Sequence, residues 1–225
     1  MTLDRREFVG RVAAGAMLAG FPLPVDASIR AFDGAVPGAA EKWDLSWVNR
    51  ITGKYRAVFD VPEIESGYGV WRASIWGKQY QDVLGVKARE MTPVLVLRHN
   101  GIVLAMQQAF WDKYGIGPEK KVLHPVTQEP TDRNPALLAS SRSEVPASLD
   151  DVALDRFLAR GGIALACNLA LQDMVELIEK KDGASPDVAR QQATAALVPG
   201  VILQPSGVFA ALRAQDAGCR YLRAS

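Results

Sequence analysis

Short apolar runs alternate with stretches of helical periodicity between residues 54 and 225. The run at 93–97 is continuously apolar, as in a strand that is buried on both faces of a sheet. Between the runs, apolar residues recur at the spacing of one face of an amphipathic helix. This alternation predicts an α/β fold, a single three-layer α/β/α domain with a five-stranded, mainly parallel sheet. The predicted strands are residues 55–59, 93–97, 163–166, 201–203 and 221–222.

Helices are predicted between these strands. The periodicity predicts helices over 65–84 and 103–114, one from Ser148 as its cap to Gly161, and one that starts at Ser185-Pro186. Residues 115–147 lack this periodicity and are repeatedly interrupted by proline, which predicts a long loop. Such a loop covers a site or packs on a neighbouring subunit, and its composition does not decide between the two.

The N-terminus has the pattern of an export signal. Arg5 and Arg6, followed by Phe8, stand just before an apolar stretch at 12–21. The pattern resembles the twin-arginine signal, which implies transport by the twin-arginine export machinery, cleavage before Ser28 and a periplasmic location. The apolar stretch is shorter than the ~20 residues that span a bilayer, so no stable membrane span is expected in the mature form.

Three segments are therefore expected along the chain. Residues 1–27 form the signal peptide, residues 28–53 form a linker or N-terminal arm whose first part, 28–42, is rich in Ala, Gly and Pro, and residues 54–225 form the folded domain. The domain is long enough to bury a core without disulfides or metals.

Composition and charge narrow the classes of function. The chain has 225 residues, 48% of them hydrophobic, and its 26 Lys and Arg against 25 Asp and Glu give a formal net charge of +1. This balance gives no general attraction to nucleic acid, which is therefore not an expected partner. The absence of GxGxxG, GxxxxGK[ST] and GxSxG motifs disfavours nucleotide cofactors, and the cofactor stays unknown. Two cysteines and two histidines without short spacing predict no disulfide framework and no metal site within one chain.

The candidate chemistry lies where the predicted strands end, because ligands of open parallel sheets bind beyond the carboxyl ends of the strands. Cys167 is the candidate nucleophile, since the first turn of a helix stabilises a thiolate through its N–H groups and its dipole. His99 is a candidate base or cation if its strand lies next to that of Cys167. The candidate ligand-binding residues at the same edge are Asp60, Asn100, Asn168 and Ser206.

Structural roles are the alternative for the same residues. A free cysteine between Ala166 and Leu169 is often a small buried apolar side chain, and a histidine without an identified acidic partner often has only a structural hydrogen bond. Cys219 precedes the last predicted strand and is expected to be structural.

The C-terminal third resembles the DsrE/DsrF-like family of small sulfur-relay proteins. The motifs that carry the resemblance are residues 161–168, 197–201, 205–208 and 215–222. The resemblance covers approximately residues 54–223, and it implies a five-stranded parallel sheet, assembly into homo- or hetero-oligomers, and a persulfide on the cysteine that corresponds to Cys167.

Two functions are consistent with these observations. In the first, the protein handles sulfur in the periplasm: Cys167 accepts a sulfane sulfur from a donor and passes it to an acceptor protein, with His99 stabilising charge. In the second, it is a non-catalytic protein that binds a small ligand or assembles into an oligomer, and Cys167 is structural. Whether the chain is an enzyme stays open at this point, and a homo-oligomer is expected in either case.

Overall fold

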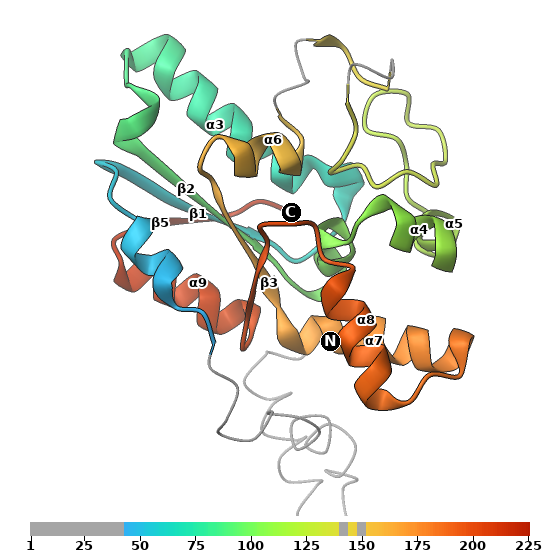
Figure 1. Ribbon diagram of the computed structural model, residues 1–225. Coiled ribbons are helices and arrows are strands. Elements are labelled where there is room, and N and C mark those ends of the chain that lie inside the picture. The colour runs from blue at the N-terminus through green and yellow to red at the C-terminus, as the bar shows by residue number, and fades with distance from the viewer. Residues whose placement is uncertain (1–42, 140–143, 148–151) are drawn as a thin grey trace, which may run out of the picture. The chain divides into compact units, whose positions relative to one another are not determined.

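The computed structural model describes residues 43–139, 144–147 and 152–225. These residues form an α/β domain around a five-stranded sheet whose strands are all parallel (Figure 1). The predicted fold class is therefore confirmed. The export motif with Arg5, Arg6 and Phe8 lies outside the described residues, as do residues 28–42 of the arm predicted at 28–53 and the expected helix cap Ser148.

The sheet consists of five strands in the order β4-β3-β2-β1-β5. Val58, Val94 and Ile163 pair across β1, β2 and β3 and belong to one apolar cluster. The next residues, Phe59, Leu95 and Ala164, also pair and belong to the other cluster, so the centre of the sheet is apolar and covered on both faces. Because every strand runs in the same direction, all five carboxyl ends meet at one edge. The strands are β1 (Tyr55–Val61), β2 (Met91–Leu97), β3 (Ile163–Cys167), β4 (Ile202–Gln204) and β5 (Arg220–Arg223).

Helices cover the sheet with two separate apolar clusters. The larger cluster includes Trp71 of α3, Phe157 of α6 and Leu171 of α7, whereas the smaller one includes Ala210 of α9 and Trp47 of η1. The α-helices are α3 (Tyr68–Leu84), α4 (Gln108–Tyr114), α5 (Ile116–Glu119), α6 (Leu154–Ala159), α7 (Asn168–Asp182), α8 (Pro186–Ala195) and α9 (Gly207–Asp216). The 3-10 helices are η1 (Ser46–Arg50), η2 (Glu65–Gly67), η3 (Ala88–Glu90) and η4 (His99–Ala105).

The single helix predicted at 103–114 is wrong in detail, because the chain forms η4 and then α4 there. Between the two helices, the backbone of Met106 makes a β-bridge with Leu197, and the N–H of Gln107 donates to the Ala196 carbonyl at 2.9 Å. These contacts with the chain after α8 replace the hydrogen bonds that would continue a helix. The short helix α5 also lies within the region predicted to be a loop.

The N-terminal side of the domain contributes to the core. Trp47 lies on η1, before the first strand, and has no solvent exposure. It belongs to the smaller cluster together with Val58, Val94 and Ala210. Its indole therefore covers the face of the sheet that α9 also covers.

Asn134 holds the irregular segment after α5 against the core. Its buried side chain donates to the carbonyl oxygens of Leu104 at 3.1 Å and Met106 at 2.7 Å, and it accepts the N–H of Ala136 at 2.9 Å. All three partners are backbone groups that would otherwise lack a partner away from water. A single amide thus joins this segment to η4.

Replacing Asn134 with Ala is expected to lower the free energy of unfolding by about 2–3 kcal/mol, because it leaves buried backbone groups without hydrogen bonds. Urea denaturation of the purified protein measures this loss. Asp132→Ala, at an exposed position of the same segment, is the control and should change the free energy by less than about 0.5 kcal/mol. Equal losses in the two variants would contradict the role given to Asn134.

Candidate functional site

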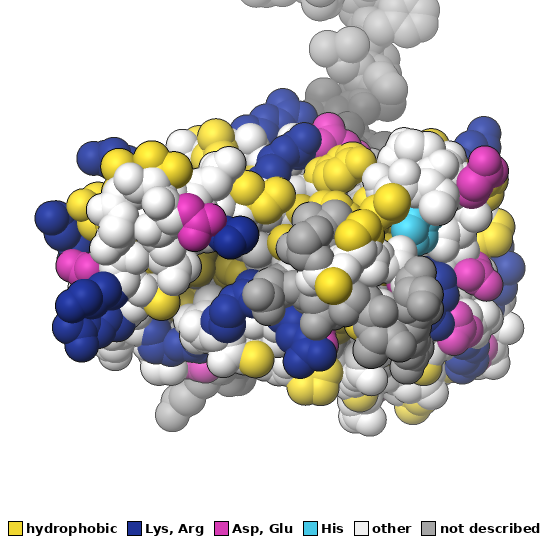
Figure 2. Space-filling model, turned by 90° about the horizontal axis from the view of Figure 1, so that it is seen from above, with side chains coloured by type: hydrophobic (Ala, Val, Ile, Leu, Met, Phe, Trp, Pro, Cys, Tyr) yellow, Lys and Arg dark blue, Asp and Glu magenta, His cyan; other side chains and the backbone are white. Residues whose placement is uncertain are grey.

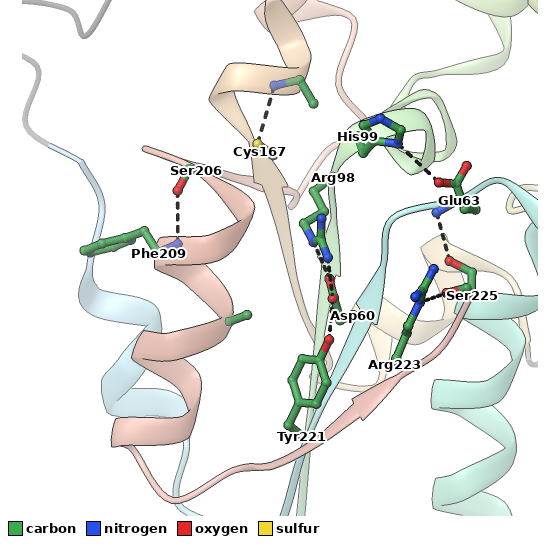
Figure 3. A network of polar contacts seen from close by, with 12 residues as sticks. Asp60, Glu63, Arg98, His99, Cys167, Ser206, Phe209, Tyr221, Arg223 and Ser225 are labelled. Atoms are coloured by element: carbon green, nitrogen blue, oxygen red, sulfur yellow. Dashed lines mark hydrogen bonds and ion pairs between the residues drawn. The ribbon is translucent and has the colours of Figure 1, made fainter. Parts of the chain in front are cut away.

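The carboxyl edge of the sheet brings together the ends of β1, β2, β3 and β5 (Figure 3). Leu97 on β2 pairs with Ala166 on β3, so the next residues, Arg98 and Cys167, leave neighbouring strands at the same level. Cys167 and His99 can act together only if their strands are adjacent, and β2 and β3 are adjacent.

An ion pair with a buried carboxylate lies at the centre of this edge. The side chain of Asp60 at the end of β1 is 2% exposed, and Arg98 donates to both of its carboxylate oxygens, from Nε at 2.7 Å and from Nη2 at 2.8 Å. The hydroxyl of Tyr221 on β5 donates to the same carboxylate at 2.6 Å. Hydrogen bonding to Asp60 raises the pKa of Arg98 and also raises the pKa of Tyr221. Three strands are thus joined through one carboxylate.

The start of α9 packs on this pair. A Cβ at Gly207 would lie 2.5 Å from both Cβ and Cδ of Arg98, so only glycine fits there. The preceding residue, Ser206, caps α9, because its Oγ accepts the N–H of Phe209 at 3.0 Å. The candidate ligand-binding residue Ser206 therefore has a structural hydrogen bond.

His99 and Asn100 both contact Glu63, the third residue after Asp60. Nδ1 of His99 lies 3.2 Å from Oε1 of Glu63, and the amide of Asn100 donates to Oε2 at 2.9 Å. Figure 3 shows the His99 ring turned toward Glu63. His99 has φ 50°, in the left-handed region, and its side chain is 64% exposed. It is the candidate at this edge that solvent reaches most easily.

The close approach of the two loops depends on Gly101. A Cβ at this position would lie 2.2 Å from the carbonyl oxygen of Val61, and the N–H of Gly101 donates to the Pro62 carbonyl at 2.9 Å. This contact places η4 directly against the segment after β1. His99 and Asn100 reach Glu63 because of it.

Cys167 ends β3 and is the N-cap residue of α7. Its Sγ accepts the N–H of Ala170 at 3.4 Å, and the residue is 6% exposed within the larger apolar cluster. The position is the one expected from the sequence, at a strand end facing the N–H groups of a helix. The next residue, Asn168, is buried and accepts a hydrogen bond from Arg190 of α8.

Cys219 has a different environment. It lies just before β5 within the smaller apolar cluster, and burial raises the pKa of its thiol to about 11, although the nearby Arg56 acts in the opposite direction. Both cysteines are free. At neutral pH Cys219 is therefore a protonated core residue.

Arg98, Glu63 and Tyr221 were not among the residues singled out in the sequence. A signal for one of them was present, because a carboxylate that ends a buried strand, as Asp60 does, needs a cation close by. Arg98 is the first residue after the neighbouring strand and meets that need. Tyr221 could not be found in this way, since its contact depends on β5 lying beside β1.

Comparisons with protein-family models and with curated proteins find no match to this chain. The resemblance to DsrE/DsrF-like proteins therefore rests on the quoted residues. Within the described ranges, no group of three or more His, Cys, Asp or Glu side chains is placed to hold a metal ion. No helix among the described residues has the length and apolar character needed to cross a membrane.

Asp60→Ala is expected to lower the free energy of unfolding by about 2–3 kcal/mol, because it leaves Arg98 without its carboxylate. The loss is smaller than for a fully buried pair, since water reaches part of the Arg98 side chain. Tyr221→Phe removes one hydrogen bond and should cost about 1 kcal/mol. Denaturant unfolding of both variants measures the ranking, and a larger loss in Tyr221→Phe would refute the central role of the ion pair.

Proposed function

We propose that this protein is a DsrE-like sulfur carrier in which Cys167 holds a sulfane sulfur. The observation that carries the proposal is the hydrogen bond from the Ala170 N–H to Sγ of Cys167 at the start of the 15-residue helix α7. Negative charge at such a position is stabilised by the helix dipole. A persulfide is an anion, so the same groups stabilise the loaded state.

The loading step needs a thiolate and a donor that contains a sulfane sulfur. The Cys167 thiolate attacks the terminal sulfur of a polysulfide, an S–S bond forms on the protein, and the polysulfide leaves one sulfur shorter with the electron pair of the broken S–S bond. Atoms and charge balance without an oxidant. In this proposal His99 meets the incoming donor, because its side chain is exposed at the neighbouring strand exit.

Burial of Cys167 favours a second function. The residue packs among apolar side chains of the larger cluster and exposes 6% of its surface, as a structural cysteine does. In that case the protein binds a small ligand or assembles into an oligomer without sulfur chemistry. The two functions differ in whether the folded protein reacts.

Exposure of the folded protein to inorganic polysulfide, followed by intact-mass measurement and peptide mapping, distinguishes them. A sulfur carrier gains 32 Da or multiples of it on the peptide that contains Cys167, and cyanide or a reductant removes the gain. Cys167→Ser should lose the adduct entirely. Cys219→Ser is the matched control and should load like the natural protein, because the Cys219 thiol is protonated well above neutral pH.

Loading that occurs only after unfolding, or equally on both cysteines, would overturn the sulfur-carrier proposal and support the structural role. A donor and an acceptor protein are the partners that the sulfur-carrier proposal requires, besides further copies of this chain.

We also propose that the protein is exported to the periplasm by the twin-arginine route. The support is the sequence Arg5-Arg6-Glu7-Phe8 ahead of an apolar stretch. A double variant in which Lys replaces both Arg5 and Arg6 keeps the positive charge and should hold the precursor in the cytoplasm. Fractionation of cells that express the two forms measures this, and periplasmic accumulation of the Lys variant would disprove this route.

A further inference from the structure

Arg190 of α8 places a cation beside the start of α7. Its Nη2 donates to the side-chain oxygen of Asn168, the residue that follows Cys167 in the chain. Asn168 is 3% exposed, so its amide is fixed where α7 and α8 pack against one another. Arg190 itself is half-buried, so solvent reaches part of its side chain. A positive charge is thereby held next to the cysteine that is proposed to carry sulfur.

This charge has no acidic partner in the part of the chain that the structure describes. The Asn168 amide is neutral, and it makes the one hydrogen bond of the Arg190 guanidinium to a described residue. Arg98, which leaves the neighbouring strand at the level of Cys167, differs in this respect, because the Asp60 carboxylate binds it (Figure 3). Of these two arginines, Arg190 therefore supplies the uncompensated charge.

The overall charge of the surface does not produce such a site. The formal net charge of the chain is +1, and Figure 2 shows one face on which Lys and Arg side chains lie among Asp, Glu and apolar side chains. Exposed charges beyond the Debye length, about 8 Å at physiological ionic strength, are largely screened. Asp187, one turn before Arg190 on α8, is exposed and forms no ion pair with it. The potential at Cys167 is thus set mainly by Arg190 and the N–H groups of α7.

The loading step brings a second anion to a site that already holds one. The Cys167 thiolate attacks a polysulfide, which is itself negatively charged, and the two like charges repel one another. A guanidinium beside the thiolate reduces this repulsion and donates hydrogen bonds to the charged end of the donor. A neutral organic polysulfide gains neither advantage.

We infer that Arg190 is a specificity-determining residue of the sulfur-carrier site, which binds the negatively charged end of an anionic sulfur donor beside Cys167 and favours it over a neutral donor of the same size. Asn168 is the positioning residue, because its buried amide holds the guanidinium. The identity of the anion as a sulfur donor rests on the proposed function, whereas the charge at the site is measurable without sulfur.

Iodoacetate and iodoacetamide measure this charge at Cys167 in the full chain. The two reagents have nearly the same size and the same leaving group, iodide, but only iodoacetate is an anion. Both alkylate the same thiolate, so the ratio of their rates on the Cys167 peptide does not depend on the fraction of thiolate or on the exposure of the sulfur. Peptide mapping by mass spectrometry gives both rates.

Arg190→Gln removes the charge and keeps a side chain that can bond to Asn168. The ratio of the iodoacetate rate to the iodoacetamide rate should fall at least about fivefold at low ionic strength. Added salt should lower the ratio of the natural protein in the same direction. Arg190→Lys keeps the charge and should retain most of the ratio. Arg89→Gln is the matched control, because Arg89 is exposed on η3 just before β2, at the opposite edge of the sheet, and should leave the ratio unchanged.

Asn168→Asp gives Arg190 an acidic partner and should also lower the ratio, which provides a second variant if Arg190→Gln does not fold. Circular dichroism and thermal melting establish which variants are folded. Equal ratios in the natural protein and in the folded variants would overturn the inference. So would a folded natural protein whose Cys167 reacts with neither reagent.

Inorganic polysulfide separates this inference from the sulfur-carrier proposal. Arg190→Gln should load Cys167 about fivefold more slowly than the natural protein. Equally fast loading of the two proteins would support the sulfur carrier and overturn the role of Arg190. A charge-dependent ratio of alkylation rates without any loading by polysulfide would support an anion site at Arg190 and overturn the sulfur carrier.

Discussion

A carboxylate at the end of a buried strand cannot stay charged without a partner, and the carboxyl edge of this sheet is organised by that constraint. Asp60 obtains its cation, Arg98, from the neighbouring strand and a hydroxyl, that of Tyr221, from the strand on its other side. The aliphatic part of Arg98 in turn requires glycine at position 207, which lets α9 approach. The backbone carbonyl of Asp60 also accepts the N–H of Ala224 after β5. One ion pair thereby connects the ends of three strands and limits how closely α9 can approach them.

The carboxyl edge of the sheet has two parts that differ in their polar groups: the ion pairs around Asp60 and the mainly apolar surroundings of Cys167. On the β1 side, acidic and basic groups are matched with one another, Asp60 with Arg98 and Glu63 with His99. On the β3 side, the sulfur faces backbone N–H groups and apolar side chains. A charge that appears on the sulfur is therefore met by fixed dipoles, which need no rearrangement. These surroundings of Cys167 stabilise a small anion on the sulfur better than a bulky charged ligand.

The strands and the main helices could be predicted because their residues carry local signals, namely apolar runs of strand length, helical periodicity and helix caps. Cys167 was placed correctly at a strand end and helix start for that reason. Contacts between distant segments leave no such trace. Tyr221 contacts Asp60 only because β5 lies beside β1 in the sheet. Asn134 bonds to backbone carbonyl groups, which every residue has, so the sequence does not indicate its partners. The break between η4 and α4 likewise depends on the end of α8, which no local pattern reveals.

The strand order has a consequence for how the sheet is completed. β5 pairs with β1, and the Tyr221–Asp60 bond joins residues 161 positions apart in the chain. A contact of this separation forms late, because the entropy of closing so long a loop has to be overcome before it contributes. Until β5 is synthesised, one side of β1 presents unpaired N–H and C=O groups to other chains. Between the synthesis of β1 and that of β5 the nascent chain is thus open to wrong strand pairing at β1, and β5 then replaces β1 as the edge strand of the sheet.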